Sequence, residues 1–119
     1  MEKENVIRTK SYAFALRIIN LYKYLIKEKK EFVLSKQILR SGTSVGSNIE
    51  ESVGCNSRKD FVNKMDIAYR ESRESLYWLN LLKDSEYISA EAYESISLDC
   101  EELIKILGKI ISTSRNKNR

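Results

Sequence analysis

Apolar residues recur every three or four positions along most of the chain, which is the period of an amphipathic α-helix, about 3.6 residues. In the first such segment, about residues 9–30, Arg17, Asn20 and Lys27 fall on the face opposite the apolar stripe. The pattern therefore predicts a long helix with one broad apolar face. That face comprises Phe14, Ala15, Ile18, Ile19, Leu21, Tyr22, Leu25 and Ile26.

Two later segments repeat the pattern and carry signals for a helix start. Residues 58–84 follow a capping box formed by Ser57 and Asp60, and residues 90–113 follow Ser89, a suitable N-cap. Both segments are therefore expected to be helices. Their predicted core positions are Phe61, Met65, Ala68, Ser72, Leu76 and Leu79 in one, and Ala92, Ile96, Cys100, Leu103, Leu107 and Ile110 in the other.

The remaining segment, about residues 35–55, contains the stretch RSGTSVGSNIEES, whose glycines and serines are poor helix formers. Its glycines, Gly42 and Gly46, do not match the spacing of a phosphate-binding loop, and no lysine follows them. The stretch also lacks the alternation of a strand, whereas Ile38, Gly42, Val45, Ile49 and Val53 keep a helical spacing. We therefore predict a helix whose glycines allow a neighbouring helix to approach closely.

Four helices with short connections predict an all-α fold, an antiparallel up-down-up-down four-helix bundle. The chain has 119 residues, no proline and four glycines, which suits one domain of long helices over residues 1–119. Its last residues, from Ser112 to Arg119, are basic and polar, and we expect them to form a short frayed tail.

Composition excludes several classes of function. The chain has no histidine, which removes the common nucleophile–histidine mechanisms and histidine-ligated metal sites. We predict no enzymatic activity, no cofactor and no metal. The first ten residues do not resemble a signal peptide, and no apolar run is long enough to span a membrane. We therefore expect a cytoplasmic protein with two reduced cysteines and no membrane association.

Two motifs resemble those of the small four-helix-bundle proteins encoded within intervening sequences of bacterial 23S ribosomal RNA genes. The resemblance covers about residues 10–110 and is most specific between Gln37 and Leu82. Ser47 and Glu50 depart from the alanines that are usual in the first motif. The matching positions are Leu39, Arg40, Ser44, Asn48, Ile49 and Glu51 in the first motif, and Phe61, Ala68, Glu71, Glu74, Trp78 and Leu79 in the second.

The resemblance implies a four-helix bundle that assembles as a ring-shaped homopentamer. The chain is also similar to the accessory variability determinant of diversity-generating retroelements. That similarity implies a basic pentamer that associates with nucleic acid and with a reverse transcriptase. It assigns no catalytic activity.

Charge is uneven along the last third of the chain. Residues 86–102 carry six acidic groups and no basic group, whereas residues 105–119 carry five basic groups and no acidic group. An antiparallel bundle places the end of the fourth helix beside the starts of the first and third. The predicted nucleic-acid interface at that end is Arg8, Lys10, Arg58, Lys59, Lys109, Arg115, Lys117 and Arg119. The alternative is a solvated end whose cations complement the helix dipole.

Two other groups of residues have a functional and a structural interpretation. Arg70 and Arg73, beside Tyr77, are candidates for contact with RNA, but Asp66 and Arg70 form an ordinary i,i+4 pair, and we favour an exposed helix surface with no such role. Glu71 suits either acid–base chemistry or a polar network between helices, and we favour the network. Its expected partners are Arg40, Ser44 and Asn48.

Some large apolar groups fall outside the core stripes, and their positions predict self-association. They are Leu16 and Tyr24 on the first helix and Tyr77 and Leu81 on the third, with a flank of Thr43, Ser44 and Ser47 on the second. The predicted function is a non-enzymatic homo-oligomer that binds RNA or DNA through its basic end. The alternative is a protein–protein scaffold, or an accessory subunit of a protein partner such as a reverse transcriptase, with no direct contact to nucleic acid.

Overall fold

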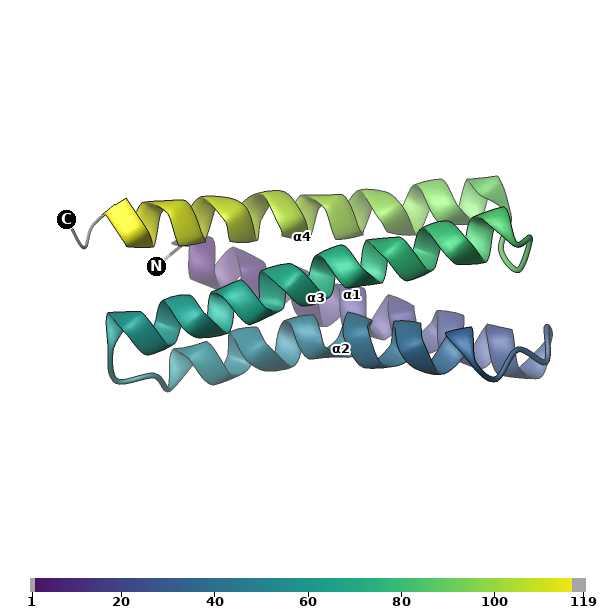
Figure 1. Ribbon diagram of the computed structural model, residues 1–119, viewed down its shortest axis with the longest axis horizontal. Helices are drawn as coiled ribbons and strands as arrows, with labels where there is room; N and C mark the ends of the chain where they lie inside the picture. The colour runs from purple at the N-terminus through teal and green to yellow at the C-terminus, as the bar shows by residue number, and fades with distance from the viewer. Residues whose placement is uncertain (1, 117–119) are drawn as a thin grey trace.

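The computed structural model describes residues 2–116, and this part of the chain forms four helices joined by short turns. The helices are α1 (Glu2–Lys27), α2 (Leu34–Val53), α3 (Arg58–Asp84) and α4 (Ala90–Asn116). Each helix runs antiparallel to the one before it, in a rod with extents of 49 × 22 × 20 Å (Figure 1). The predicted all-α, up-down-up-down four-helix bundle is confirmed.

Helix α1 starts earlier and ends earlier than the predicted range of residues 9–30. Ile7 is fully buried and Ser11 is nearly so, which extends the packed face of the helix toward the N-terminus. The helix ends at Lys27 because Lys30 has a φ of 53°, a left-handed conformation that a right-handed helix does not accommodate.

The glycine-rich stretch is helical, as predicted, and both of its glycines face α1. A Cβ atom added to Gly42 would lie 2.7 Å from Cγ1 of Ile18, closer than atoms can approach without a shift. A Cβ atom on Gly46 would meet the backbone and hydroxyl oxygens of Ser11 at 3.5 Å, an ordinary contact. Close packing therefore requires glycine at position 42, whereas position 46 also has room for an alanine.

The end of α2 differs from the prediction. The helix stops at Val53, not at residue 55, where the N–H of Gly54 donates to the carbonyl of Glu51 and the N–H of Cys55 to that of Ser52. Val53 was expected in the core but is 56% exposed, and Ser52 is buried instead. The core face moves to Ser52 because a helical period of about 3.6 residues carries the buried side there from Ile49.

Both predicted caps are present. The Ser57 hydroxyl accepts the N–H of Asp60 at 3.1 Å, and the Ser89 hydroxyl accepts the N–H of Ala92 at 3.0 Å. Ala92 itself is exposed, which corrects its assignment to the core, because it lines an open cleft between α1 and α4.

The end of α4 is more ordered than expected. The helix continues to Asn116 with Ile111 and Ser114 buried, so the predicted frayed tail is helical as far as that residue. The rest of that tail lies outside the described residues. Among residues 2–116, no helix combines the length and the apolarity that a membrane span requires.

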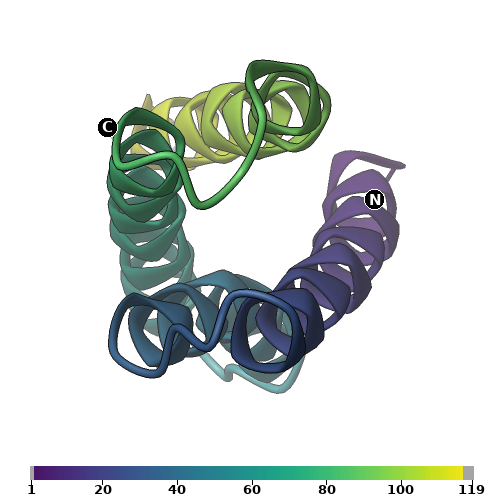
Figure 2. The same cartoon turned by 90° about the vertical axis from the view of Figure 1, so that its right-hand side faces the viewer.

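The four helices do not pack equally. An end-on view shows α2 close to both α1 and α3, and α3 close to α4, whereas α1 and α4 diverge (Figure 2). The core residues Phe14, Val45, Met65 and Leu103 are completely or almost completely buried, so the interior is closed despite this divergence. The α1/α4 edge is therefore the open side of the bundle.

Candidate nucleic-acid interface and polar network

The antiparallel fold brings the starts of α1 and α3 and the end of α4 to one end of the rod, and with them the predicted basic residues that lie in these helices (Figure 1). Two of them are committed to ion pairs between helices. The Arg8 guanidinium is bonded to both carboxylate oxygens of Glu50 at 3.1 Å, and Lys10 Nζ lies 3.2 Å from Glu102. These cations are partly neutralised, so they are weaker candidates for binding phosphate.

The other predicted cations within the described part of the chain are exposed, and none of them forms an ion pair there. They are Arg58, Lys59, Lys109 and Arg115. Lys117 and Arg119 lie outside the described residues. Lys105, which the sequence analysis did not select, is also exposed, and it lies one helical turn before Lys109. Its position in the basic run after residue 102 was a signal that could have identified it.

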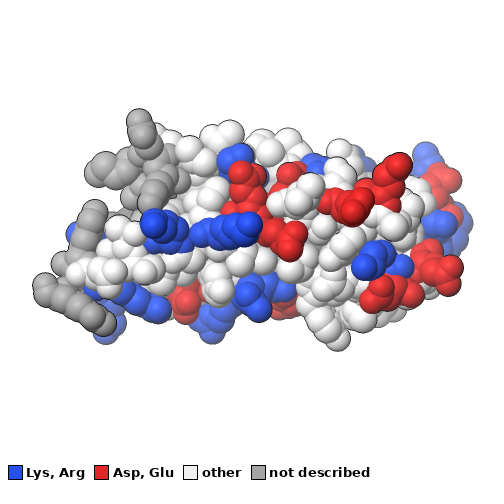
Figure 3. Space-filling view, turned by 90° about the horizontal axis from the view of Figure 1, so that it is seen from above, with Lys and Arg blue, Asp and Glu red and all other residues white. Residues whose placement is uncertain are grey.

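The surface of α4 changes sign along its length. Basic side chains gather over its C-terminal half and acidic side chains over its N-terminal half (Figure 3). Acidic groups favour a helix N-terminus and basic groups a C-terminus, so this order also suits the helix dipole.

A shallow groove of about 410 Å³ lies beside the basic half of α4, between α4 and α3. The ring of Tyr69 lies against α4 at Gly108, where an added Cβ atom would be 3.7 Å from the ring, an ordinary contact. The guanidinium of Arg73 lies over the same ring, 5.9 Å from its centre. Arg70 is paired with Asp66 at 3.3 Å, as expected for an exposed helix surface. The groove lining is Asp66, Tyr69, Gly108, Ile111, Ser112, Arg115 and Asn116.

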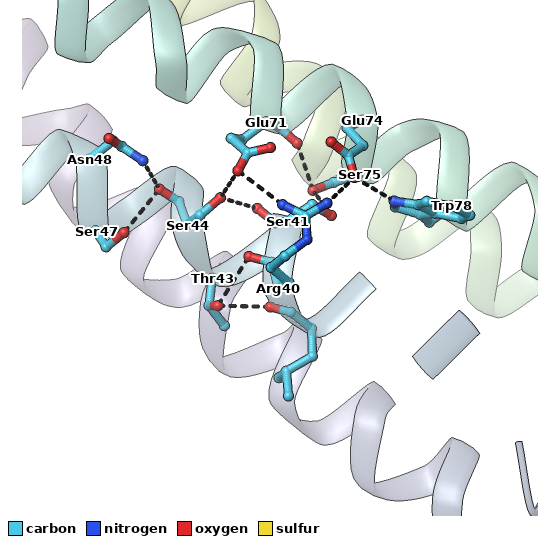
Figure 4. A network of polar contacts seen from close by, with 11 residues as sticks. Arg40, Ser41, Thr43, Ser44, Ser47, Asn48, Glu71, Glu74, Ser75 and Trp78 are labelled. Atoms are coloured by element: carbon cyan, nitrogen blue, oxygen red, sulfur yellow. Dashed lines mark hydrogen bonds and ion pairs between the residues drawn. The ribbon is translucent and has the colours of Figure 1, made fainter. Parts of the chain in front are cut away.

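Three of the four predicted network residues meet between α2 and α3 (Figure 4). A carboxylate oxygen of Glu71 lies 2.6 Å from the Ser44 hydroxyl and 3.2 Å from the Arg40 guanidinium. Asn48, the fourth, donates instead to the carbonyl of Ser44 on its own helix, at 2.8 Å. Asn48 supports the position of Ser44 and does not reach Glu71.

The network includes residues that sequence reasoning missed. Arg40 also contacts Glu74, whose carboxylate accepts the indole N–H of Trp78 at 2.9 Å. Below them, the buried hydroxyls of Ser41 and Ser75 lie 3.0 Å apart. The spacing of Glu71, Glu74 and Trp78 along one side of a helix was available in the sequence, but their common partner on α2 was not.

This arrangement joins two helices and leaves little scope for acid–base chemistry. One guanidinium serves two carboxylates, and each carboxylate also accepts a hydrogen bond from another side chain. Arg40 is half exposed, so its charge retains contact with water. The network therefore fixes the register of α2 against α3.

The predicted buried cysteine is Cys100, whose thiol lies 3.2 Å from the carbonyl oxygen of Ser72. Burial, together with the nearby charges of Glu101 and Asp99, raises its pKa to about 12. The thiol is therefore protonated and unreactive at neutral pH. Cys55 is partly exposed at the end of α2.

Comparison with known proteins gives the family. The model of the 23S rRNA-intervening sequence protein family matches residues 3–109. This chain belongs to that family. A search of curated proteins finds no match.

A solved structure of the same type has the same fold. It is the crystal structure of a protein with unknown function from the S23 ribosomal protein family of Bacteroides thetaiotaomicron VPI-5482. The identity is 56% over 92% of this chain and 98% of the other, with a TM-score of 0.91. Arg40, Ser44, Glu71 and Glu74 are among the positions by which the chain resembles the intervening-sequence family. In this member their side chains form the polar contact between α2 and α3.

Proposed function

We propose that this member of the 23S rRNA-intervening sequence protein family is a non-enzymatic RNA-binding protein that acts as a homo-oligomer. The observation that carries the proposal is the basic half of α4, where Lys105, Lys109 and Arg115 are exposed and form no ion pair within the described residues. Arg58 and Lys59 lie at the same end of the rod. Cations that have no acidic partner are available to phosphate groups.

The arrangement favours contact with the nucleic-acid backbone over recognition of particular bases. Phosphate contacts from lysine and arginine give binding that depends strongly on salt and little on sequence. Beside these cations, the exposed guanidinium of Arg73 over Tyr69 offers a planar cationic surface on which an unpaired base can stack. Single-stranded RNA is therefore the preferred ligand, with single-stranded DNA a weaker alternative.

Self-association is the second part of the proposal. Several large apolar side chains on α1 and α4 are exposed, namely Tyr12, Leu16, Tyr24 and Leu98. An assembly of identical chains buries such groups and places several basic surfaces side by side. The net charge of one chain is only +4, so this multiplication contributes strongly to affinity.

The test compares two matched pairs of charge reversals. Lys105→Glu with Lys109→Glu changes the proposed surface, and Lys23→Glu with Lys27→Glu makes the same change on α1. Both pairs are exposed, are spaced by one helical turn, and form no ion pair within residues 2–116. Fluorescence anisotropy with a labelled single-stranded RNA, repeated over a salt series, gives the affinity and its salt dependence.

We expect the α4 pair to weaken binding at least tenfold. Its plot of log affinity against log salt concentration should be shallower by about 1.4 per chain, because two phosphate contacts are lost at about 0.7 each. The α1 pair should weaken binding much less. Equal losses for the two pairs would mean that only net charge matters. No binding by the wild type near physiological salt would favour the scaffold or accessory-subunit alternative.

A further inference from the structure

The open α1/α4 edge contains a cleft of about 670 Å³, which the proposed RNA surface does not use. Leu21, Ile88 and Ile96 give it an apolar floor, and Tyr24 forms one wall. A second hollow, of about 440 Å³, shares Tyr24 and Ile88 and extends the cleft toward the α3–α4 turn. A cleft of this size accommodates one or two large side chains.

The inner end of the cleft is held in a defined shape. The Arg17 guanidinium crosses from α1 to α4, where it bonds Asp99 at 2.7 Å and the carbonyl of Ser95 at 3.2 Å. This bridge ties the two helices together below the cleft while leaving the mouth open. The cleft is therefore a preformed part of the bundle edge.

The α1–α2 turn exposes two adjacent apolar side chains. Phe32 is 54% exposed and Val33 is 70% exposed, and neither fills the cleft of its own chain. The turn is rigid because the Glu31 carboxylate accepts the backbone N–H groups of Val33, Leu34 and Ser35 at 2.7–3.2 Å. A fixed apolar projection loses little conformational entropy when it docks.

The projection and the rim of the main cleft carry opposite charge. Two exposed lysines flank the projection and form no ion pair within the described residues, namely Lys30 and Lys36. Glu91 lies on the rim of the main cleft, and the basic residue of that lining, Arg17, is paired with Asp99. The outer hollow has mixed charge, with Glu86 beside Lys29 and Lys83. Opposite charges at the edge of an apolar contact favour the correct partner and orientation.

We propose that the Phe32–Val33 turn of one copy docks in the α1/α4 cleft of a second copy. The proposal rests on the homo-oligomer of the proposed function and identifies its contact. The turn and the cleft are different surfaces, and the proposed arrangement is head-to-tail, so that a dimer leaves one turn and one cleft free for further copies. Repetition of the contact closes a ring or extends a chain.

The first experiment removes the projection and measures mass by light scattering over a concentration series. Phe32→Asp combined with Val33→Asp should raise the concentration at which the wild-type assembly dissociates by at least tenfold. Val53→Asp is the control, because Val53 is 56% exposed and lies at the opposite end of α2. Circular dichroism checks that every variant remains helical.

The second experiment uses the head-to-tail geometry. Ala92→Arg obstructs the cleft at an exposed position, and Ala13→Arg is its control at an exposed alanine on α1 away from the cleft. The turn variant and the cleft variant should each be monomeric alone. Mixed in equal amounts, they should form a species of twice the 13.9 kDa chain mass and nothing larger, because only one intact contact remains.

The outcomes separate this contact from the wider proposal. A wild type that stays monomeric throughout the series overturns both the docking and the homo-oligomer. A wild-type oligomer that the turn or cleft variants leave unchanged overturns the docking alone, as does a mixture that forms no two-chain species. RNA binding by monomeric variants measures the α4 surface independently of assembly.

Discussion

The two sides of α2 and the α1/α4 edge solve the same packing problem differently. Along α2, small residues such as Ser41, Gly42 and Ser44 let the neighbouring helices approach closely, and polar side chains satisfy one another between them. Along the α1/α4 edge, long side chains reach across a wider space, as in the pairs Arg17–Asp99 and Lys10–Glu102. The first arrangement fixes the spacing of helices, and the second leaves room for a ligand or partner.

The difference shows how poor helix formers contribute to a stable helix. Two glycines cost about 1 kcal/mol each in helix propensity compared with alanine. Contacts made possible by their small size offset this cost, because dispersion contacts accumulate over a close interface. Exposed ion pairs contribute about 0–1 kcal/mol each, so the α1/α4 edge gains less from its longer side chains.

The largest effect should come from adding one methyl group to each glycine of α2. Gly42→Ala should destabilise the fold by about 1–3 kcal/mol, because Ile18 is fully buried and has little room to move. Gly46→Ala should stabilise it by about 0.5–1 kcal/mol, because the methyl group fits and alanine favours the helix. Urea denaturation measures both. Equal effects would break the distinction between the two glycines.

The next prediction compares the loss of one carboxylate at the α2/α3 contact with the loss of one at the α1/α4 edge. Glu71→Ala should cost about 2 kcal/mol, because it removes contacts to Arg40 and Ser44 in a partly buried site. Asp99→Ala should cost about 1 kcal/mol or less, because its pair with Arg17 is about half exposed. Thermal and urea unfolding of the two variants test this order. A larger loss for Asp99→Ala would show that the open edge depends on its ion pair.

The α1–α2 turn should make the free energy of unfolding depend on pH through Glu31. Burial alone would raise the pKa of Glu31, but three backbone N–H donors outweigh it, so the pKa is lowered from 4.5. The ionised Glu31 carboxylate therefore contributes fully to the free energy of unfolding above pH 4.5. This contribution is lost as the pH falls through the lower pKa that Glu31 has in the folded protein. Glu31→Gln should cost about 1 kcal/mol at neutral pH. The difference from wild type should shrink in urea titrations toward about pH 3, and a constant difference would contradict the assignment.

The smallest change concerns the two thiols and leaves the fold intact. Cys100, with a pKa of about 12, should have a thiolate fraction of about 1 in 10,000 at pH 8. Cys55 is partly exposed and should react rapidly with a thiol reagent such as dithiobis-nitrobenzoate. One fast thiol per folded chain is expected, and both should react in denaturant. Two fast thiols would mean that the α3/α4 contact opens readily.

The sequence predicted the helices well because their apolar period is regular. It did not locate their ends, because these depend on features such as the left-handed Lys30 and the capping carboxylate of Glu31, which lies before the helix that it caps. It identified Arg40, Ser44 and Glu71 but not Glu74 as a shared partner of Arg40. Which side chains meet across helices depends on rotation and spacing, which periodicity does not determine.

The exposed cations at the basic end of the rod were harder to predict than the fold, for a related reason. Residues at one end of the rod were identified from topology alone, yet Arg8 and Lys10 are paired with acids on neighbouring helices. Net charge along the chain does not reveal such pairs, because Glu50 and Glu102 lie far away in sequence. The unbroken run of basic residues in α4 was a more reliable signal for exposed cations that form no ion pair within the described residues.

The change of charge along α4 also limits how much nucleic acid one chain could hold in the proposed function. From Lys105 to Arg115 the helix rises about 15 Å, at about 1.5 Å per residue, and Glu101 and Glu102 border it on one side. A strand with phosphates about 3.4 Å apart, as in a duplex, places about four of them along that length. In the proposed function, each copy would therefore have a footprint of only a few nucleotides. A longer RNA would pass from one copy to the next, so the spacing between copies would set the length of RNA that the proposed assembly covers.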